Sequence, residues 1–361
     1  MRVARTRAAL KKVARVRAML GLLMSEQNQA RFDPRLRAVV VSRRPLVYDV
    51  GPDVAVDRPA HVRAGSGLAH AAGRLVVVQD DASFFALLSP TGAVEALTLP
   101  HEVEGRRQFE AARGNKYQKL DLEACVTLPD GRVLALGSGS RDVRTRVVLA
   151  GFDEAGNAVS VVLRDVPALY AALANERRFS GSQINLEGAA ALPALGVLRL
   201  FQRGNGAACD GFTPVSASCD LALDALLQHL DDASAPVPAL RDVAQWRLGE
   251  VDGTALGFTD ACAAADRIFF LAAAEASPNT YDDGSVSGVV LGVTDGLAAV
   301  TGARLARLEQ ADGAPFRSKA EGLALDPRDP TRALVVLDDD DATRPAELCE
   351  LRLDGPWWEA R

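Results

Sequence analysis

Ser318-Lys319-Ala320-Glu321-Gly322-Leu323-Ala324-Leu325 shows a pattern that occurs at four other places in the chain. In every copy, a small polar or acidic residue and a tiny residue lead into an apolar run. The other copies are Ser66-Gly67-Leu68-Ala69, Glu123-Ala124-Cys125-Val126, Glu187-Gly188-Ala189-Ala190 and Asp260-Ala261-Cys262-Ala263. From Ser66 to Glu321, successive first residues are 57, 64, 73 and 61 positions apart. A period of this length, with several strands in each unit, predicts an all-β protein built as a β-propeller.

Further strand signals lie between the motifs. Short runs rich in β-branched, aromatic and leucine residues follow turn-forming Gly, Asp or Pro residues, and one hairpin spans 146–152 and 158–163. The second strands of the units are expected at 75–78, 133–136, 197–200, 268–271 and 334–337. The last unit lacks a fourth strand after 348–353, whereas a strand at 37–42 precedes the first motif. We therefore expect the N-terminal strand to complete the last blade and close the ring, because closure removes exposed sheet edges.

The motif count predicts a single closed propeller of five four-stranded blades over residues 37–361. A sixth blade is the alternative if residues 37–60 contain a degenerate unit. Residues 1–36 are expected to form a basic N-terminal extension, because Met1 to Met24 places apolar residues at helical spacing against Lys and Arg. This helix has no place in the repeat, so residues up to about 30 are expected to be dispensable for folding.

Charge and composition exclude several classes of protein. Residues 1–44 carry a net charge of +10 and the remainder carries −16, and an acidic body of this kind is unsuited to nucleic acid. No apolar run reaches the roughly 18 residues that span a bilayer. The five cysteines include no CxxC pair, which argues against structural zinc. We expect a cytoplasmic monomer, with a periplasmic or secreted location left open if the N-terminus is a degenerate export signal.

The residues that begin the motifs would form a ring, because the first strand of each propeller blade lines the central channel. Four of them are carboxylates, namely Glu123, Glu187, Asp260 and Glu321. Like charges this close raise one another's pKa and cost stability unless something offsets them. A hard divalent cation, Ca²⁺ or Mg²⁺, would be bound by these four carboxylates directly. Alternatively, each carboxylate holds backbone N–H groups of the next blade; both interpretations stay open.

Basic and amide side chains are expected at the same end of the channel. Second strands run antiparallel to first strands, so their far ends return to the level where the motifs begin. Acidic residues there include Asp80, Glu275 and Asp338. A mixture of acids and bases suits a cation together with a small anionic ligand. The residues expected to hold that ligand are Lys119, Arg141, Arg203, Asn205 and Lys319.

Glu187-Gly188-Ala189-Ala190 and Glu321-Gly322-Leu323-Ala324 resemble the E-G-x-A strand starts of the esterase-like phytase propellers and of related bacterial propellers of unknown function. The resemblance covers roughly residues 60–355. It implies a propeller and, as in some members, cation-assisted hydrolysis of phosphate esters. Under that reading, a carboxylate such as Glu187 or Glu321 would orient the attacking water.

This chain departs from the pattern in three copies, with Ser66 for Glu, Ala124 for Gly, and Asp260-Ala261 for Glu-Gly. Two functions therefore stay open. One is the cation-dependent binding or hydrolysis of a small phosphate-bearing molecule, which would make the protein a phosphoric ester hydrolase. The other is a non-catalytic propeller module that binds a small ligand or a partner protein.

Overall fold

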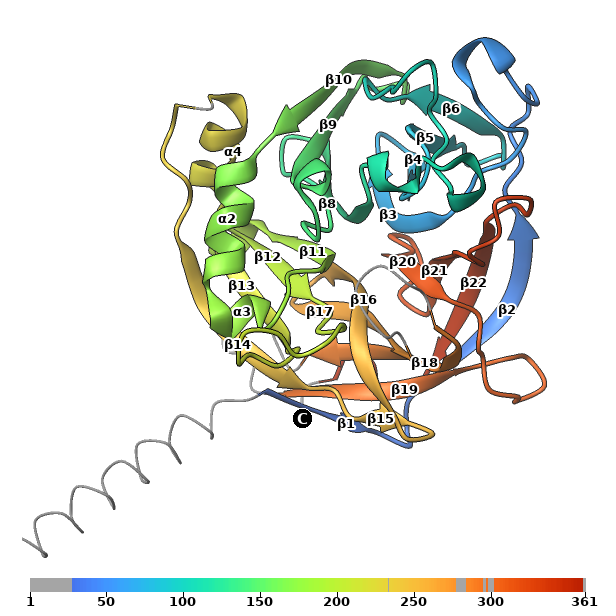
Figure 1. The fold of residues 1–361 in the computed structure, drawn as a ribbon. Coiled ribbons are helices and arrows are strands. Elements are labelled where there is room, and N and C mark those ends of the chain that lie inside the picture. Colours follow the sequence, from blue (N-terminus) through green and yellow to red (C-terminus); the bar gives the residue numbers. More distant parts are fainter. Residues whose placement is uncertain (1–27, 233, 277–283, 295–296, 298–301, 360–361) are drawn as a thin grey trace, which may run out of the picture.

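The computed structural model describes residues 28–232, 234–276, 284–294, 297 and 302–359. The basic helix predicted at Met1–Met24 lies outside the described residues. Within them the chain is all-β and propeller-like: antiparallel pairing joins strands into groups of four that surround a common centre (Figure 1).

Each group is built from strands that are consecutive or nearly so in the chain. The first is β3 (Gly65–Ala71), β4 (Arg74–Gln79), β5 (Phe84–Leu88) and β6 (Val94–Thr98). The second is β7 (Leu122–Thr127), β8 (Val133–Gly137), β9 (Arg146–Phe152) and β10 (Ala158–Asp165). The third is β11 (Leu186–Leu192), β12 (Val197–Gln202), β13 (Ser216–Ala222) and β14 (Leu240–Arg247). The fourth is β16 (Thr254–Ala264), β17 (Arg267–Glu275), β18 (Val286–Thr294) and β19 (Gly302–Glu309), with β15 (Glu250–Val251) added to β16.

The last group is completed by the N-terminal part of the chain, as the sequence predicted. β20 (Ala320–Leu325), β21 (Arg332–Leu337) and β22 (Glu347–Asp354) are consecutive, and β2 (Arg37–Pro45) then pairs antiparallel with β22. An additional strand that the sequence did not predict, β1 (Asn28–Phe32), pairs in parallel with both β14 and β19. β1 thus links the third group to the fourth, although it falls within residues 1–36, which were expected to form a separate extension.

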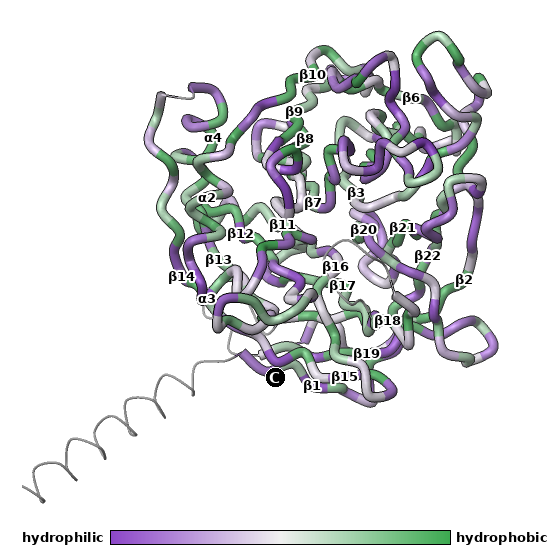
Figure 2. The backbone as a smooth tube through the Cα atoms, in the orientation of Figure 1, coloured by the Kyte–Doolittle hydropathy of each residue, from purple (hydrophilic) through white to green (hydrophobic). Residues whose placement is uncertain are grey.

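A separate apolar core cluster fills the space between every two neighbouring groups. Successive side chains of a strand point to opposite faces of its sheet, and β12 shows how the sequence uses this. Leu198 and Leu200 pack between the second and third groups, whereas Phe201 packs between the third and fourth. Both faces of such a strand are buried, which is why the strands are largely apolar while hydrophilic residues gather in the connecting loops (Figure 2).

Helices lie in the connections. α2 (Pro167–Asn175), α3 (Arg177–Ser180) and α4 (Leu223–Asp231) extend the core cluster between the second and third groups. Short 3₁₀ helices are η1 (Val54–Val56), η2 (Ala111–Arg113), η3 (Lys116–Gln118), η4 (Asp142–Arg144) and η5 (Pro193–Leu195). Among the described helices, none combines the length and the apolar character needed to cross a membrane.

The first strand of each group lies nearest the centre and contacts its two counterparts. β3 contacts β7, β7 contacts β11, β11 contacts β16, β16 contacts β20, and β20 contacts β3. We call these five the inner strands. Their beginnings meet at one end of a central channel and their far ends meet at the other.

Candidate functional site

Every inner strand has a β-bulge, where one extra residue interrupts the pairing with the second strand. The bulge is close to the beginning of four of these strands and in the middle of β16. A bulge re-aims the side chain of the extra residue, and bulges are frequent beside functional sites. The bulged residues are Ser66, Glu123, Glu187, Thr259 and Glu321. Four of these five are the ring residues expected from the motif. The exception is Thr259 of β16, the inner strand of the fourth group.

In β16 the bulged residue is Thr259, so the alignment of the fourth motif was wrong by one residue. Asp260 occupies the position of Gly188 and Gly322, not that of the glutamates. Because of this shift, Ala261 and not Cys262 is the equivalent of Cys125. None of the five cysteines forms a disulfide.

Hydroxyl and aspartate side chains clamp neighbouring inner strands together. Ser66 donates a hydrogen bond to the Leu122 carbonyl oxygen at 2.5 Å, and Thr259 donates one to that of Ala320 at 2.8 Å. Asp260 accepts hydrogen bonds from the backbone N–H groups of Ala261 and Leu323, both at 2.7 Å. The Asp260 carboxylate therefore performs the structural role that the sequence left open for the whole ring, with both oxygens engaged.

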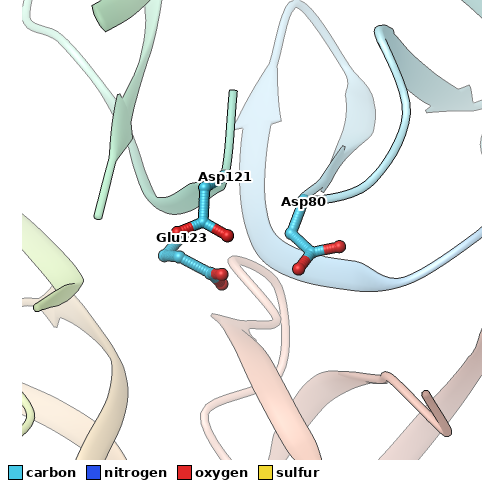
Figure 3. A group of neighbouring side chains, drawn as sticks. All are labelled: Asp80, Asp121 and Glu123. Atoms are coloured by element: carbon cyan, nitrogen blue, oxygen red, sulfur yellow. The ribbon is translucent and has the colours of Figure 1, made fainter. Parts of the chain in front are cut away.

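Three carboxylates converge where the first two groups meet (Figure 3). Asp80 follows β4, Asp121 precedes β7, and Glu123 is the bulged residue of β7. One oxygen of each lies within 4.8 Å of the others. Asp80 is 9% exposed, and its Oδ1 atom has no hydrogen-bond partner among the described residues. The Glu123 carboxylate likewise has neither a hydrogen bond nor an ion pair with any described residue.

Two buried cations hold the Asp121 side of this group. The Lys119 ammonium contacts Asp80 Oδ2, and it lies 2.7 Å from Asp121 Oδ1. The Arg144 guanidinium lies 2.7 Å from Asp121 Oδ2, to which the Ser138 hydroxyl also donates a hydrogen bond. Burial alone would lower the pKa of Lys119, but Asp121 and Asp80 outweigh it and hold the pKa well above its ordinary value.

Arg203, which follows β12, connects the third, fourth and fifth groups. Its Nη1 atom lies 3.2 Å from Glu187 Oε1 and 3.8 Å from Glu321 Oε1, and its Nη2 atom contacts Glu275 at the end of β17. Asn185 donates from Nδ2 to Glu187 Oε1 at 2.5 Å and to Asn205 Oδ1 at 3.1 Å.

Lys319 extends the network towards the loop after β21. Its ammonium lies 3.0 Å from Asp340 Oδ1, 3.3 Å from Glu321 Oε1 and 3.8 Å from Asp338 Oδ2. A cavity of about 160 Å³ adjoins this loop and is lined by Asp80, Lys119, Asp338 and Asp340, among others. We call the whole network the acid cluster; it comprises Asp80, Asp121, Glu123, Glu187, Glu275, Glu321, Asp338 and Asp340 with Lys119, Arg144, Arg203 and Lys319.

Burial raises the pKa of several carboxylates in the acid cluster, whereas Lys119 and Arg144 outweigh burial at Asp121 and lower its pKa. Burial raises the pKa of Glu187 to about 7 and that of Glu321 to about 8, although Arg203 and Lys319 act in the opposite direction. The pKa of Asp338 rises to about 7 for the same reason. Glu123 is raised well above its ordinary pKa by desolvation and then by the charges of Asp121 and Asp80. Burial therefore opposes the ionisation of these four carboxylates.

The structure brings together most of the residues singled out in the sequence. Glu123, Glu187, Glu321, Lys119, Arg203 and Lys319 belong to the acid cluster, and Asn205 adjoins it through Asn185. Arg141 is exposed at the start of η4. Asp121 was missed, although a signal existed: it stands two residues before Glu123, as Lys319 stands before Glu321 and Asn185 before Glu187.

Comparison with known proteins assigns a family. Residues 61–353 match the model of a family of unknown function, DUF6929. None of the curated proteins compared with the chain matches it. Among solved structures, Myxococcus xanthus glutaminyl cyclase is similar at a TM-score of 0.43 and 12% identity, covering 91% of this chain and 99% of that one.

Two further solved structures are similar over most of their length. Penicillium chrysogenum α-L-arabinanase has a TM-score of 0.42 and 9% identity, and the match covers 86% of this chain and 98% of the arabinanase chain. Virginiamycin B lyase from Staphylococcus aureus has a TM-score of 0.38 and 11% identity, and the match covers 88% of this chain and 99% of the lyase chain. All three are propeller-type folds.

Proposed function

We propose, for a chain that belongs to the DUF6929 family of unknown function, that the acid cluster binds a divalent cation and, through it, a small phosphate-bearing molecule. The observation that carries the proposal is the convergence of Asp80, Asp121 and Glu123 within 4.8 Å, with Asp80 Oδ1 buried and without a hydrogen-bond partner in the described part of the chain. A buried oxygen that lacks a partner costs free energy, and a cation would remove that cost.

The charge of the acid cluster supports a cation as the missing partner. Its eight carboxylates face four cationic side chains, so it would carry a formal charge of −4 if all were ionised. Carboxylate oxygens are the ligands that Ca²⁺ and Mg²⁺ prefer. Binding of either ion would neutralise part of the excess and would favour the ionised form of Glu123.

The number of ligands supports an anion as the second guest. Three carboxylates, each binding through one oxygen, leave about three or more positions of a Mg²⁺ or Ca²⁺ ion open, since these ions take roughly six to eight oxygen ligands. Phosphate oxygens and water are suited to such positions. Lys119 and Lys319 stand beside the carboxylates and supply positive charge, and we retain Arg141, Arg203 and Asn205 as further candidates for holding the anion.

Hydrolysis of the bound ester is a second candidate function. Burial raises the pKa of Glu187 and Glu321 to about 7 and 8, and a pKa near neutrality suits a group that takes and returns a proton. One of these carboxylates would orient the water while the cation polarises the phosphoryl group. This reading agrees with the resemblance to the esterase-like phytase propellers, which likewise remains a proposal.

We also infer that the inner strands close into one propeller of five blades. The support is the uninterrupted circuit of contacts from β3 through β7, β11, β16 and β20 back to β3. One core cluster between every two neighbouring groups is the second support.

Calorimetric titration with CaCl₂ and MgCl₂ after EDTA treatment tests the cation. We expect one of the ions to bind and to raise the free energy of unfolding, by about 2.7 kcal/mol at a hundredfold excess over Kd. Glu123→Gln should weaken binding at least about tenfold. In EDTA it should not lower stability, because burial and the neighbouring carboxylates oppose ionisation of Glu123 and no hydrogen bond to the described residues is lost. Glu95→Gln, at an exposed position of β6 outside the acid cluster, is the matched control.

The outcomes separate the interpretations. If neither ion binds, or if Glu123→Gln binds it as well as the wild type does, the cation proposal fails. Inorganic phosphate should then be titrated with and without the bound cation, and we expect binding only with it. Release of p-nitrophenol from p-nitrophenyl phosphate tests hydrolysis: turnover that Glu321→Gln abolishes supports an enzyme, and its absence leaves a binding module.

A further inference from the structure

The opposite end of the central channel contains a second cavity, of about 590 Å³. All five inner strands contribute to it with residues that follow their bulges. They are Leu68–His70 of β3, Cys125–Thr127 of β7, Ala189 and Ala191 of β11, Cys262–Ala264 of β16, and Leu323–Leu325 of β20. The inner strands all run in the same direction, so the acid cluster and this cavity, which we call the apolar chamber, lie at opposite ends of the channel.

The apolar chamber is lined by residues of its own. Its inner-strand residues follow the bulges, whereas the acid cluster contains the bulged residues Glu123, Glu187 and Glu321. Between these two levels neighbouring inner strands pack closely against one another: a Cβ atom on Gly188 would lie 2.8 Å from the backbone nitrogen of Ala261, and one on Gly322 would lie 2.8 Å from the Gly67 Cα atom. The chamber and the acid cluster are therefore described as two sites.

The lining of the apolar chamber defines the chemistry of a ligand. It consists mainly of small apolar side chains, with the half-buried Trp358 at one side and Asp326 as the carboxylate among its lining residues. Ligand sites of drug-sized molecules have about 300–1,000 Å³, a mostly apolar lining and a few polar groups that fix orientation. The chamber meets both criteria, and its described lining residues include no lysine or arginine that would hold an anion.

His70 supplies the orienting polar group. Its Nε2 atom lies 2.9 Å from the Leu325 carbonyl oxygen, which can only accept a hydrogen bond. In the neutral ring, the proton is therefore on Nε2, and Nδ1 is left as an acceptor. The Thr127 hydroxyl does not compete for it, because it donates to the His70 carbonyl oxygen at 2.5 Å.

We propose that the apolar chamber binds a small, neutral, mainly apolar molecule that carries one hydrogen-bond donor for His70. The burial of apolar surface supplies the affinity, at roughly 25 cal/mol per Å², and the donor fixes the orientation. This site is independent of the cation and phosphate proposed for the other end.

The probe N-phenyl-1-naphthylamine tests the proposal, because it is neutral, apolar and has a single N–H donor. We expect saturable binding, seen as a rise in probe fluorescence. Ala263 lines the chamber but is exposed, so Ala263→Trp should fill space there without disturbing the core. We expect Ala263→Trp to bind the probe about tenfold more weakly or worse, and Ala191→Phe, from another inner strand, to do the same. A thermal melt of each variant establishes that it is folded.

Glu123→Gln is the control, because it alters only the other end of the channel and should leave probe binding unchanged. The proposal is overturned if the wild type shows no saturable binding. It is also overturned if both folded variants bind the probe as the wild type does, since the probe would then occupy another surface.

Discussion

Replacing Arg203 by Met removes the cation that three buried carboxylates share. The Arg203 side chain is 7% exposed and contacts Glu187, Glu275 and Glu321, which are 4%, 2% and 4% exposed. Met fills a similar volume, so the substitution mainly removes charge. Loss of one partner from a buried ion pair costs about 3–5 kcal/mol, and we expect Arg203→Met to lose this much at pH 8.

The loss should be smaller at pH 6, because the carboxylates can then bind protons. Burial raises the pKa of Glu187 to about 7 and that of Glu321 to about 8 even beside Arg203, and without Arg203 both should rise further. Between the unfolded pKa of about 4.3 and the raised folded pKa, the folded state holds more protons than the unfolded state. Stability therefore falls as the pH rises through this window, by up to about 1.4 kcal/mol per pH unit for each group.

Urea unfolding at pH 6 and pH 8, with EDTA present, measures the effect. The control is Arg352→Met, because Arg352 pairs with Asp354 at the surface, and such pairs contribute about 0–1 kcal/mol. Arg203→Met/Glu187→Gln should regain part of the loss at pH 8, since one uncompensated carboxylate is gone. A loss at pH 8 no larger than that of Arg352→Met, or a larger loss at pH 6 than at pH 8, would refute the reasoning.

Two further substitutions test how the strands are held together. Asp260→Ala should lower the free energy of unfolding by about 2–5 kcal/mol, because the N–H groups of Ala261 and Leu323 each lose a buried acceptor. Asp260→Asn keeps one acceptor and should cost less in the same urea assay. Equal losses for the two variants would contradict the structural role of Asp260. Ala30→Glu should destabilise the fold by about 2 kcal/mol or more, because Ala30 of β1 is buried in the core between the third and fourth groups. Gln29→Glu, on the exposed side of β1, should stay within about 0.5 kcal/mol, and similar melts for the two variants would mean that β1 contributes no packing.

Local sequence signals were sufficient to locate the second strand of each group. The short apolar runs at 75–78, 133–136, 197–200, 268–271 and 334–337 all fall within second strands, because turn residues mark their limits. The pairing of β2 with β22 followed from counting strands, since an incomplete last unit needs a partner from elsewhere. β1 was not predicted because it is five residues long and has a single buried side chain, so it shows no apolar pattern.

The candidate site was predicted less completely, because contacts between loops far apart in sequence decide it. Thr259-Asp260 and Glu187-Gly188 cannot be aligned from composition, since only the strand pairing shows which residue is bulged. Asp80 was recognised as an acid at a strand end, but its proximity to Asp121 depends on how the first two groups pack. A repeat indicates which strands meet at the centre, whereas the side chains between the repeats determine which atoms meet.

The bulge positions argue that the glutamates are not there for structure. Ser66 and Thr259 occupy two of these positions, and both bond to a backbone carbonyl of the next inner strand. A neutral hydroxyl is therefore sufficient to connect inner strands at a bulge. Glu123, Glu187 and Glu321 occupy the other three, where burial raises each pKa and opposes ionisation. Three residues that cost stability, at positions where serine or threonine would serve, require another reason for their presence. For Glu123, which lies within 4.8 Å of Asp80 and Asp121, the proposed cation is such a reason.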